Sequence, residues 1–239
     1  MRKTIFSLLF LACLTMLTCS SCRRKKDMPI EVFPFYNYKP RAVNLGKDSE
    51  ILMSDSIKRL RAYANDIRGG ADSVPIEKMY VLSIRLFDLG EKEDGAYWYY
   101  CAQFRTRVAC AALSWEKGDI GNDTFEKVTA LMAFQRLIGE HVNKFLAENK
   151  DTWINVCQRC MNDCKGMSFP DSLYPNLPRN DSFDLEKTVR EVAEGLDELM
   201  AHIRNESQED VLPLTDHHAN IDLASYRPRI KTIHNDIFL

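Results

Sequence analysis

The stretch from Lys92 to Trp115, KEDGAYWYYCAQFRTRVACAALSW, decides the fold class. Its apolar residues recur at intervals of three and four, the spacing that places side chains on one face of an α-helix. The main stripe consists of Tyr97, Cys101, Phe104, Val108, Ala111 and Trp115, widened by Tyr100 and Ala112. Gly118 and Gly121 then mark a turn. The pattern predicts one long helix that packs into a core.

Five further segments have the same helical period. They cover residues 54–68, 75–89, 124–148, 151–165 and 185–204, and glycine- or proline-containing stretches lie between most of them. Strict alternation of apolar and polar residues, which is typical of strands, is not found. The sequence therefore predicts an all-α fold, a single bundle of about six helices. We expect residues 54–239 to form this domain, with an irregular segment from Val211 onward.

Four aromatic residues stand side by side at positions 97–100. Successive side chains on a helix step by about 100°, so the four cannot all face the same way. We expect Tyr97 and Tyr100 to share the core side. Trp98 and Tyr99 then pack under the N-terminal segment, line a partner-binding groove or line a small-ligand pocket. Because Trp, Tyr and Arg dominate protein interfaces, the candidate partner-binding residues are Trp98, Tyr99 and Arg105.

The two helices at residues 75–115 resemble a single helix pair of the tetratricopeptide repeat family. The matching aromatic and small positions are Tyr80, Phe87, Ala96 and Tyr100. The departures, at two small positions and at the closing proline, are Ile84, Gln103 and Val108. The likeness extends over one pair of about 34 residues, whereas repeat arrays need several. It implies a helix hairpin with this kind of packing.

Residues 1–21 have the layout of a secretory signal. Arg2 and Lys3 precede an apolar run, Ile5–Leu17, that is shorter than a membrane-spanning helix requires. The sequence Ser20-Ser21-Cys22 then resembles the box at which bacterial lipoproteins are cleaved and lipidated. The resemblance implies lipidation at Cys22, with Cys19 as the alternative. An ordinary cleaved signal and an uncleaved anchor are the other interpretations.

Lipidation would place the protein in the cell envelope, with residues 22–53 as a tether. Four basic residues, Arg23–Lys26, follow the lipidated position and could lie against anionic head groups. Lipoproteins that some bacteria move to the cell surface have an acidic stretch there instead. We therefore expect an anchor in the outer membrane that faces the periplasm. The expected partners are the lipid bilayer and an unknown protein.

Charge and motifs exclude several functional classes. The formal net charge is −2, and removing residues 1–21 makes it more negative, so no nucleic-acid partner is expected. We find no nucleophile elbow, zinc-protease motif, P-loop or dinucleotide fingerprint, and we predict no catalytic residues and no cofactor. The sequence favours a protein that acts by binding. The hypotheses are an immunity-type antagonist of a secreted toxin, an envelope scaffold, and a metal- or thiol-dependent envelope protein.

Apart from the lipidation candidate Cys22, the region after the signal contains five cysteines: Cys101, Cys110, Cys157, Cys160 and Cys164. The last three form C-x2-C-x3-C and share one helix face, where three thiolates could bind zinc if a fourth ligand were present. No second pair completes such a site, so no metal is predicted; His217-His218 is a further weak candidate. In an oxidising compartment all five are disulfide candidates, with buried free thiols as the alternative. Two of them, Cys101 and Cys110, lie about 13 Å apart along one helix and cannot bridge each other.

Overall fold

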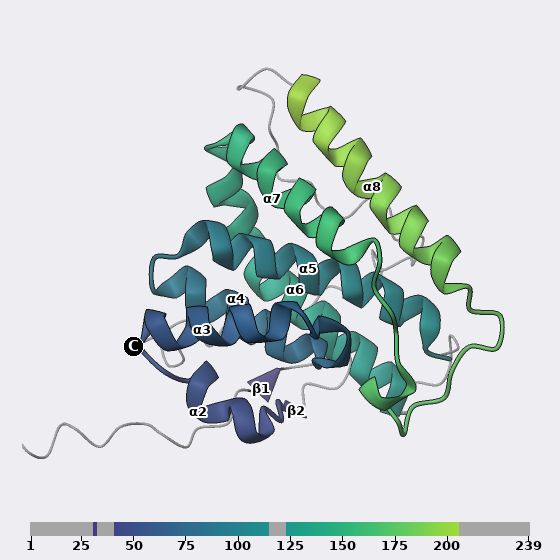
Figure 1. The fold of residues 1–239 in the computed structure, drawn as a ribbon. Helices are drawn as coiled ribbons and strands as arrows, with labels where there is room; N and C mark the ends of the chain where they lie inside the picture. Colours follow the sequence, from purple (N-terminus) through teal and green to yellow (C-terminus); the bar gives the residue numbers. More distant parts are fainter. Residues whose placement is uncertain (1–30, 33–40, 115–122, 206–239) are drawn as a thin grey trace, which may run out of the picture. The chain divides into compact units, whose positions relative to one another are not determined.

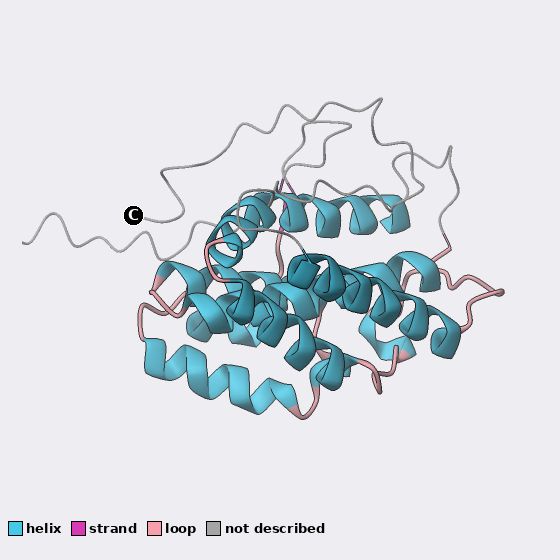
Figure 2. Ribbon diagram, turned by 90° about the horizontal axis from the view of Figure 1, so that it is seen from above, coloured by secondary structure: helices cyan, strands magenta, loops and turns pink. Residues whose placement is uncertain are grey.

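The computed structural model describes residues 31–32, 41–114 and 123–205, and these form an all-α domain (Figure 1). The helices are α2 (Ser49–Leu52), α3 (Ile57–Arg68), α4 (Ile76–Asp88), α5 (Lys92–Ala112), α6 (Asp123–Ala147), α7 (Lys150–Cys164) and α8 (Leu185–Asn205). Apart from short 3₁₀ turns, the other regular element within these ranges is a two-residue antiparallel pair, β1 (Glu31–Val32) with β2 (Arg41–Ala42). Helices thus account for nearly all of the regular structure that Figure 2 shows. The predicted fold class is confirmed.

The six predicted helices are α3 to α8, and the additional helix α2 lies in the segment expected to be a tether. Leu45 and Leu52 of this segment are buried, and α2 packs against α3 and α4. The helical body therefore begins near residue 45 and not at residue 54. The predicted boundary was late because α2 is a single turn, too short for a helical period to be recognised. The predicted irregular segment from Val211 lies outside the described residues.

Local polar contacts set where several helices begin. Ser54, the first residue of the predicted segment 54–68, accepts a hydrogen bond from Ser56 N. The Ser56 hydroxyl accepts one from Arg59 N, so Ser56 is the N-cap of α3. Asn149, two residues before the predicted segment 151–165, caps α7 by accepting a 3.1 Å hydrogen bond from Thr152 N. In both cases the side-chain oxygen satisfies a backbone N–H that has no partner within the helix.

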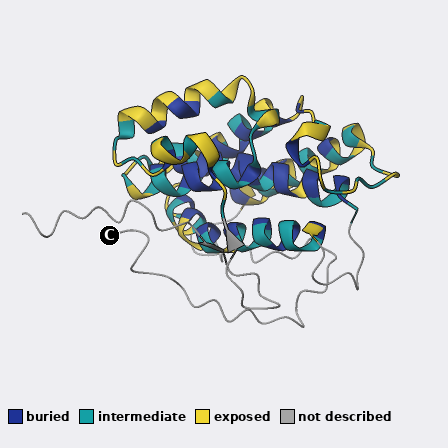
Figure 3. Cartoon of the chain, turned by 90° about the horizontal axis from the view of Figure 1, so that it is seen from below, coloured by how far each residue is buried: buried dark blue, intermediate teal, exposed yellow. Residues whose placement is uncertain are grey.

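Helix α5 is the central element, because it packs against α4, α6, α7 and α8 (Figure 1). Figure 3 shows buried residues concentrated on the inner helices, with exposed residues on the outer ones. The outer helix α8 has the pattern that the sequence predicts. Its inward stripe includes Val189, Leu196 and Ile203, which are buried, while its carboxylates Glu186, Glu191, Glu194, Asp197 and Glu198 are exposed.

The α4–α5 hairpin is closely packed, as the resemblance implies, but its closest approach differs from the expected one. The Ser83 hydroxyl donates a 2.7 Å hydrogen bond to Gly95 O. A Cβ added at Gly95 would lie 2.9 Å from Phe87 N and 3.0 Å from Ser83 O, which are distances that side chains do not tolerate. The small residues at the contact are thus Ser83 and Gly95. Ser83 directly precedes Ile84, the departure on the first helix, and Gly95 directly precedes Ala96, the matching small residue on the second.

Candidate functional site

Trp98 and Tyr99 are core residues. Each is 2% exposed, and Arg105 is 5% exposed. The prediction that these three side chains line an open partner-binding groove is therefore wrong. Helix α5 packs against α4, α6, α7 and α8, so side chains that point away from the Tyr97 and Tyr100 side can also be buried. Tyr99, for example, lies against Tyr80 of α4 and Gly139 of α6.

The buried guanidinium of Arg105 has an internal partner. Its Nη1 lies 2.7 Å from Asp72 Oδ1, and Asp72 Oδ2 accepts hydrogen bonds from the backbone N–H and the hydroxyl of Ser168. Partial burial acts to raise the pKa of Asp72, but the bonds from Ser168 and Arg105 outweigh it and lower the pKa. The Nε of Arg105 is buried and has no hydrogen-bond partner within the described part of the chain.

Three cysteine thiols converge between α5 and α7. The Sγ atoms of Cys101, Cys160 and Cys164 all lie within 4.8 Å of one another, and each residue is at most 3% exposed. Cys160 and Cys164 are one turn apart on α7, and Cys101 reaches them from α5, because these two helices pack together. We call these three residues the thiol cluster.

The sequence predicted only part of this arrangement. Cys160 and Cys164 share a face as expected, but Cys157 is buried outside the thiol cluster and Cys101 takes its place. Spacing along one helix cannot identify a partner 59 residues away. The available signal was that Cys101 belongs to the apolar stripe of the most aromatic helix. Cys110, nine residues further along α5, is also outside the cluster.

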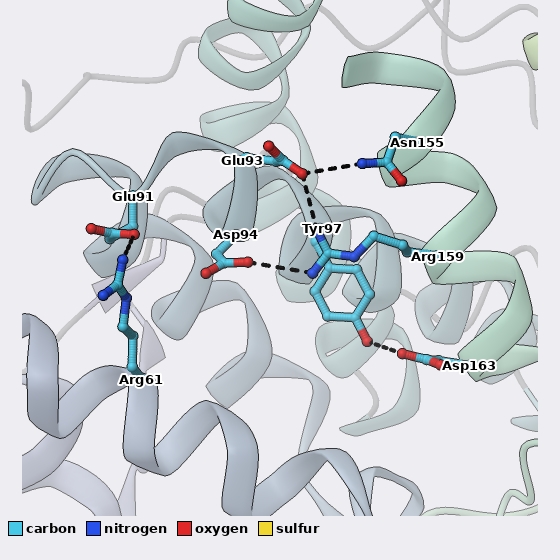
Figure 4. Close-up of polar contacts among 8 residues, drawn as sticks. All are labelled: Arg61, Glu91, Glu93, Asp94, Tyr97, Asn155, Arg159 and Asp163. Atoms are coloured by element: carbon cyan, nitrogen blue, oxygen red, sulfur yellow. Dashed lines mark hydrogen bonds and ion pairs between the residues drawn. The ribbon is translucent and has the colours of Figure 1, made fainter. Parts of the chain in front are cut away.

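A polar network joins α5 and α7 beside the thiol cluster (Figure 4). Arg159 pairs with Glu93 at 3.1 Å and with Asp94 at 3.4 Å. Its guanidinium carbon lies 4.8 Å from the centre of the Tyr97 ring, a distance at which cations are attracted to aromatic faces. These contacts link the first turns of α5 to the middle of α7.

The hydroxyl of Tyr97 completes this network. It donates a 2.5 Å hydrogen bond to Asp163 Oδ2 (Figure 4). Tyr97 is one helical turn before Cys101, and Asp163 directly precedes Cys164. The bond therefore holds α5 and α7 in the register that brings the three thiols together.

The environment raises the pKa of three of these thiols and lowers the pKa of one. Burial raises the pKa of Cys101 and raises that of Cys157 to about 12. Hydrogen bonding with Cys101 and Cys164, together with burial, raises the pKa of Cys160. Cys164 differs, because the hydrogen bonds from Cys101 and Cys160 lower its pKa. A negative charge in the thiol cluster is therefore best stabilised on Cys164.

The five cysteines at positions 101–164 are free thiols in this structure. The predicted disulfides stay a prediction, and Cys101 with Cys160 or Cys164 is the pairing that the geometry favours between helices. The other chemistry open to three converging sulfurs is the binding of a thiophilic metal ion.

The predicted lipidation sites, Cys22 and Cys19, lie outside the described residues, as does His217-His218. None of the helices in the described part of the chain is long and apolar enough to cross a bilayer.

Comparison with known proteins yields one distant likeness that we report. The chain is 24% identical over 199 residues to a protein of Haemophilus influenzae that is described only as uncharacterized. The match covers 80% of this chain and 75% of that protein. No protein-family model matches the chain, and no solved structure is significantly similar to it. The likeness extends across most of both chains but assigns no activity.

Proposed function

We propose that this protein is a lipid-anchored, periplasm-facing helical protein that acts by binding another protein. The observation that carries the proposal is the N-terminal sequence, in which a basic start and a short apolar run lead to Ser20-Ser21-Cys22. Buried acyl chains contribute about 0.8 kcal/mol per methylene, so lipidation at Cys22 would hold the helical body at a membrane without a spanning helix.

The surface of the helical body indicates how a partner would be bound. Within the described ranges, Met53 is the one large apolar side chain that is exposed, at 38%. The other exposed residues are mostly polar or charged, and they include five carboxylates on α8. Contacts made through such a surface give specificity and steer association, and salt weakens them.

The most specific form of the proposal is an immunity-type protein, which neutralises a toxin where that toxin arrives in a neighbouring cell. A tethered helical body that offers a charged surface suits this role. The alternative is a scaffold or assembly lipoprotein of an envelope complex.

In a co-culture of wild-type and deletion strains, the immunity hypothesis predicts that the wild type kills the deletion strain and that the plasmid-borne gene restores survival. Equal survival combined with an envelope defect would favour the scaffold.

Metabolic labelling with an alkyne analogue of palmitate tests the anchor directly. Replacing Cys22 by Ala should abolish labelling and release the protein from the membrane fraction. Replacing Cys19 by Ala, a matched change three residues earlier, should preserve both. Labelling that depends on Cys19 would move the anchor to that residue. An unlabelled, uncleaved chain in the cytosolic fraction would contradict the proposal.

A further inference from the structure

The thiol cluster has the composition and geometry of a metal site. Three sulfur donors come from two helices that the Tyr97–Asp163 hydrogen bond and the Arg159 ion pairs hold in register. An ion about 2.3 Å from each of three sulfurs would place those sulfurs about 4 Å apart. The observed separations are at most 4.8 Å, so small rotations of the thiol side chains suffice.

The number of donors distinguishes between the thiophilic ions. Structural zinc sites are almost always tetrahedral, with four protein ligands. Among the described residues, the group that could hold an ion contains three donors and no fourth cysteine, histidine or carboxylate. Cu(I) is stable with three sulfur ligands, and soft thiolates favour it. The donor set therefore fits Cu(I) better than Zn(II).

The charge around the thiol cluster fits an anionic copper–thiolate group. Arg105, one turn after Cys101 on α5, lies close enough to act on the charge of Cys164. Its buried Nε–H has no acceptor within the described part of the chain, although its Nη1 is paired with Asp72. Arg85 and Arg179 also have one buried N–H each without an acceptor among the described residues, so what Arg105 contributes to the argument is its positive charge near Cys164.

From these observations we infer that Cys101, Cys160 and Cys164 form a buried three-sulfur site for a single Cu(I) ion. The site would use the thiols as ligands and the Arg105 guanidinium as a positioning group that balances charge. It does not depend on the lipid anchor, and it is separate from any partner-binding surface because its ligands are inside the body.

The test is an anaerobic titration of the reduced full chain with Cu(I), against a coloured Cu(I) chelator as competitor. The wild type should retain one equivalent, with the ultraviolet charge-transfer absorption of copper–thiolate bonds. Cys101→Ala should weaken binding by more than about 100-fold, since changes even in the outer partners of metal ligands cost about 10–100-fold. Cys110→Ala is the matched control, because Cys110 is on the same helix outside the cluster, and it should bind like the wild type. Thiols elsewhere in the chain are common to both variants.

Several results would overturn the inference. They are the absence of retained copper, equal binding by the Cys101→Ala and Cys110→Ala variants, or retention of one equivalent of Zn(II) in a parallel titration that shows no Cu(I) binding. Thermal unfolding followed by circular dichroism shows whether each variant is folded. If Cys101→Ala is unfolded, Cys164→Ala, at the last residue of α7, tests the same site. Mass spectrometry after thiol alkylation adds one more criterion: a native disulfide at Cys101 in a chain that binds no copper after reduction would also contradict the inference.

Discussion

The hydroxyl of Tyr99 occupies the space that Gly139 leaves by having no side chain. A Cβ added at Gly139 would lie 2.6 Å from Tyr99 Oη, which is closer than non-bonded atoms approach. The same hydroxyl donates a 3.4 Å hydrogen bond to Gln135 O, one turn earlier on α6. This close fit between α5 and α6 explains how a third consecutive aromatic residue is buried on a helix whose Tyr97 and Tyr100 already face α7 and its neighbours.

The Tyr99–Gly139 contact predicts a strongly coupled pair of substitutions. Gly139→Ala should destabilise the protein by about 1–3 kcal/mol, because overpacking outweighs the gain in helix propensity. Tyr99→Phe should cost less than about 1 kcal/mol, since the lost hydrogen bond is long. Combined with Tyr99→Phe, Gly139→Ala should be less harmful than it is alone. Urea denaturation of the four proteins measures this coupling, and strictly additive effects would contradict the close contact.

Two helical glycines, Gly95 in α5 and Gly195 in α8, are predicted to have opposite effects on stability when replaced by alanine. Gly95→Ala should destabilise by about 1–3 kcal/mol, because the added methyl group meets the backbone of α4 at Phe87 and Ser83. Gly195→Ala, in α8, should stabilise by about 0.5–1 kcal/mol through helix propensity, since its nearest neighbour would be 3.9 Å away at Arg107. Thermal melts of both variants provide the measurement. Stabilisation by both substitutions would show that the helices are further apart at Gly95.

Asp72 predicts a pH dependence of stability. Its folded-state pKa is lowered, so it contributes stability above the unfolded-state value of about 3.9, and this contribution is lost as the pH falls through the folded value. Asp72→Asn should cost about 1–2 kcal/mol at pH 7, reduced by partial exposure, and little at pH 2–3. Denaturation between pH 2 and pH 7 checks this, with Ser168→Ala as the control that keeps the carboxylate. Parallel stability curves for Asp72→Asn and the wild type would refute it.

The hydrogen bond from Trp153 to Tyr100 predicts that removing the Tyr100 hydroxyl destabilises the protein. Trp153 Nε1 donates a 2.7 Å hydrogen bond to the Tyr100 hydroxyl, which donates to Asn143 Oδ1 at 3.3 Å. Tyr100→Phe should destabilise by about 1–3 kcal/mol, because it leaves a buried N–H without an acceptor. Tyr63→Phe, which removes a 3.3 Å bond to Asp48, should cost less. Chemical denaturation compares the two, and equal costs would show that the indole N–H finds another acceptor.

The end of helix α5 could not be predicted from the sequence. The apolar pattern continues past Ala112 to Trp115, so a helix was predicted through that residue. The structure ends α5 at Ala112, where Asn180 N and Asn180 Nδ2 donate to the carbonyls of Ala112 and Ala111. Leu113 then forms an isolated bridge with Arg179. A segment more than 60 residues away in the chain terminates the helix, and periodicity contains no information about it.

The candidate site was also predicted only in part. Cys160 and Cys164 could be placed on one face from their spacing, because an α-helix repeats every 3.6 residues. Cys101 could be placed on a buried stripe, but its meeting with α7 depends on which helices pack together. Trp98, Tyr99 and Arg105 were candidates for a partner-binding groove because the sequence does not show how many helices pack against α5.

The sequence by itself determined the fold class and the six long helices, because these depend on local periodicity. The tertiary structure alone decided that α5 packs against four other helices, that the small residues at the hairpin contact are Ser83 and Gly95, and that Cys101 joins Cys160 and Cys164. The physical reason is the separation along the chain between the residues that interact. Hydrogen bonding and side-chain direction within a helix depend on residues three or four positions apart, whereas burial and convergence depend on contacts between residues that are tens of positions apart.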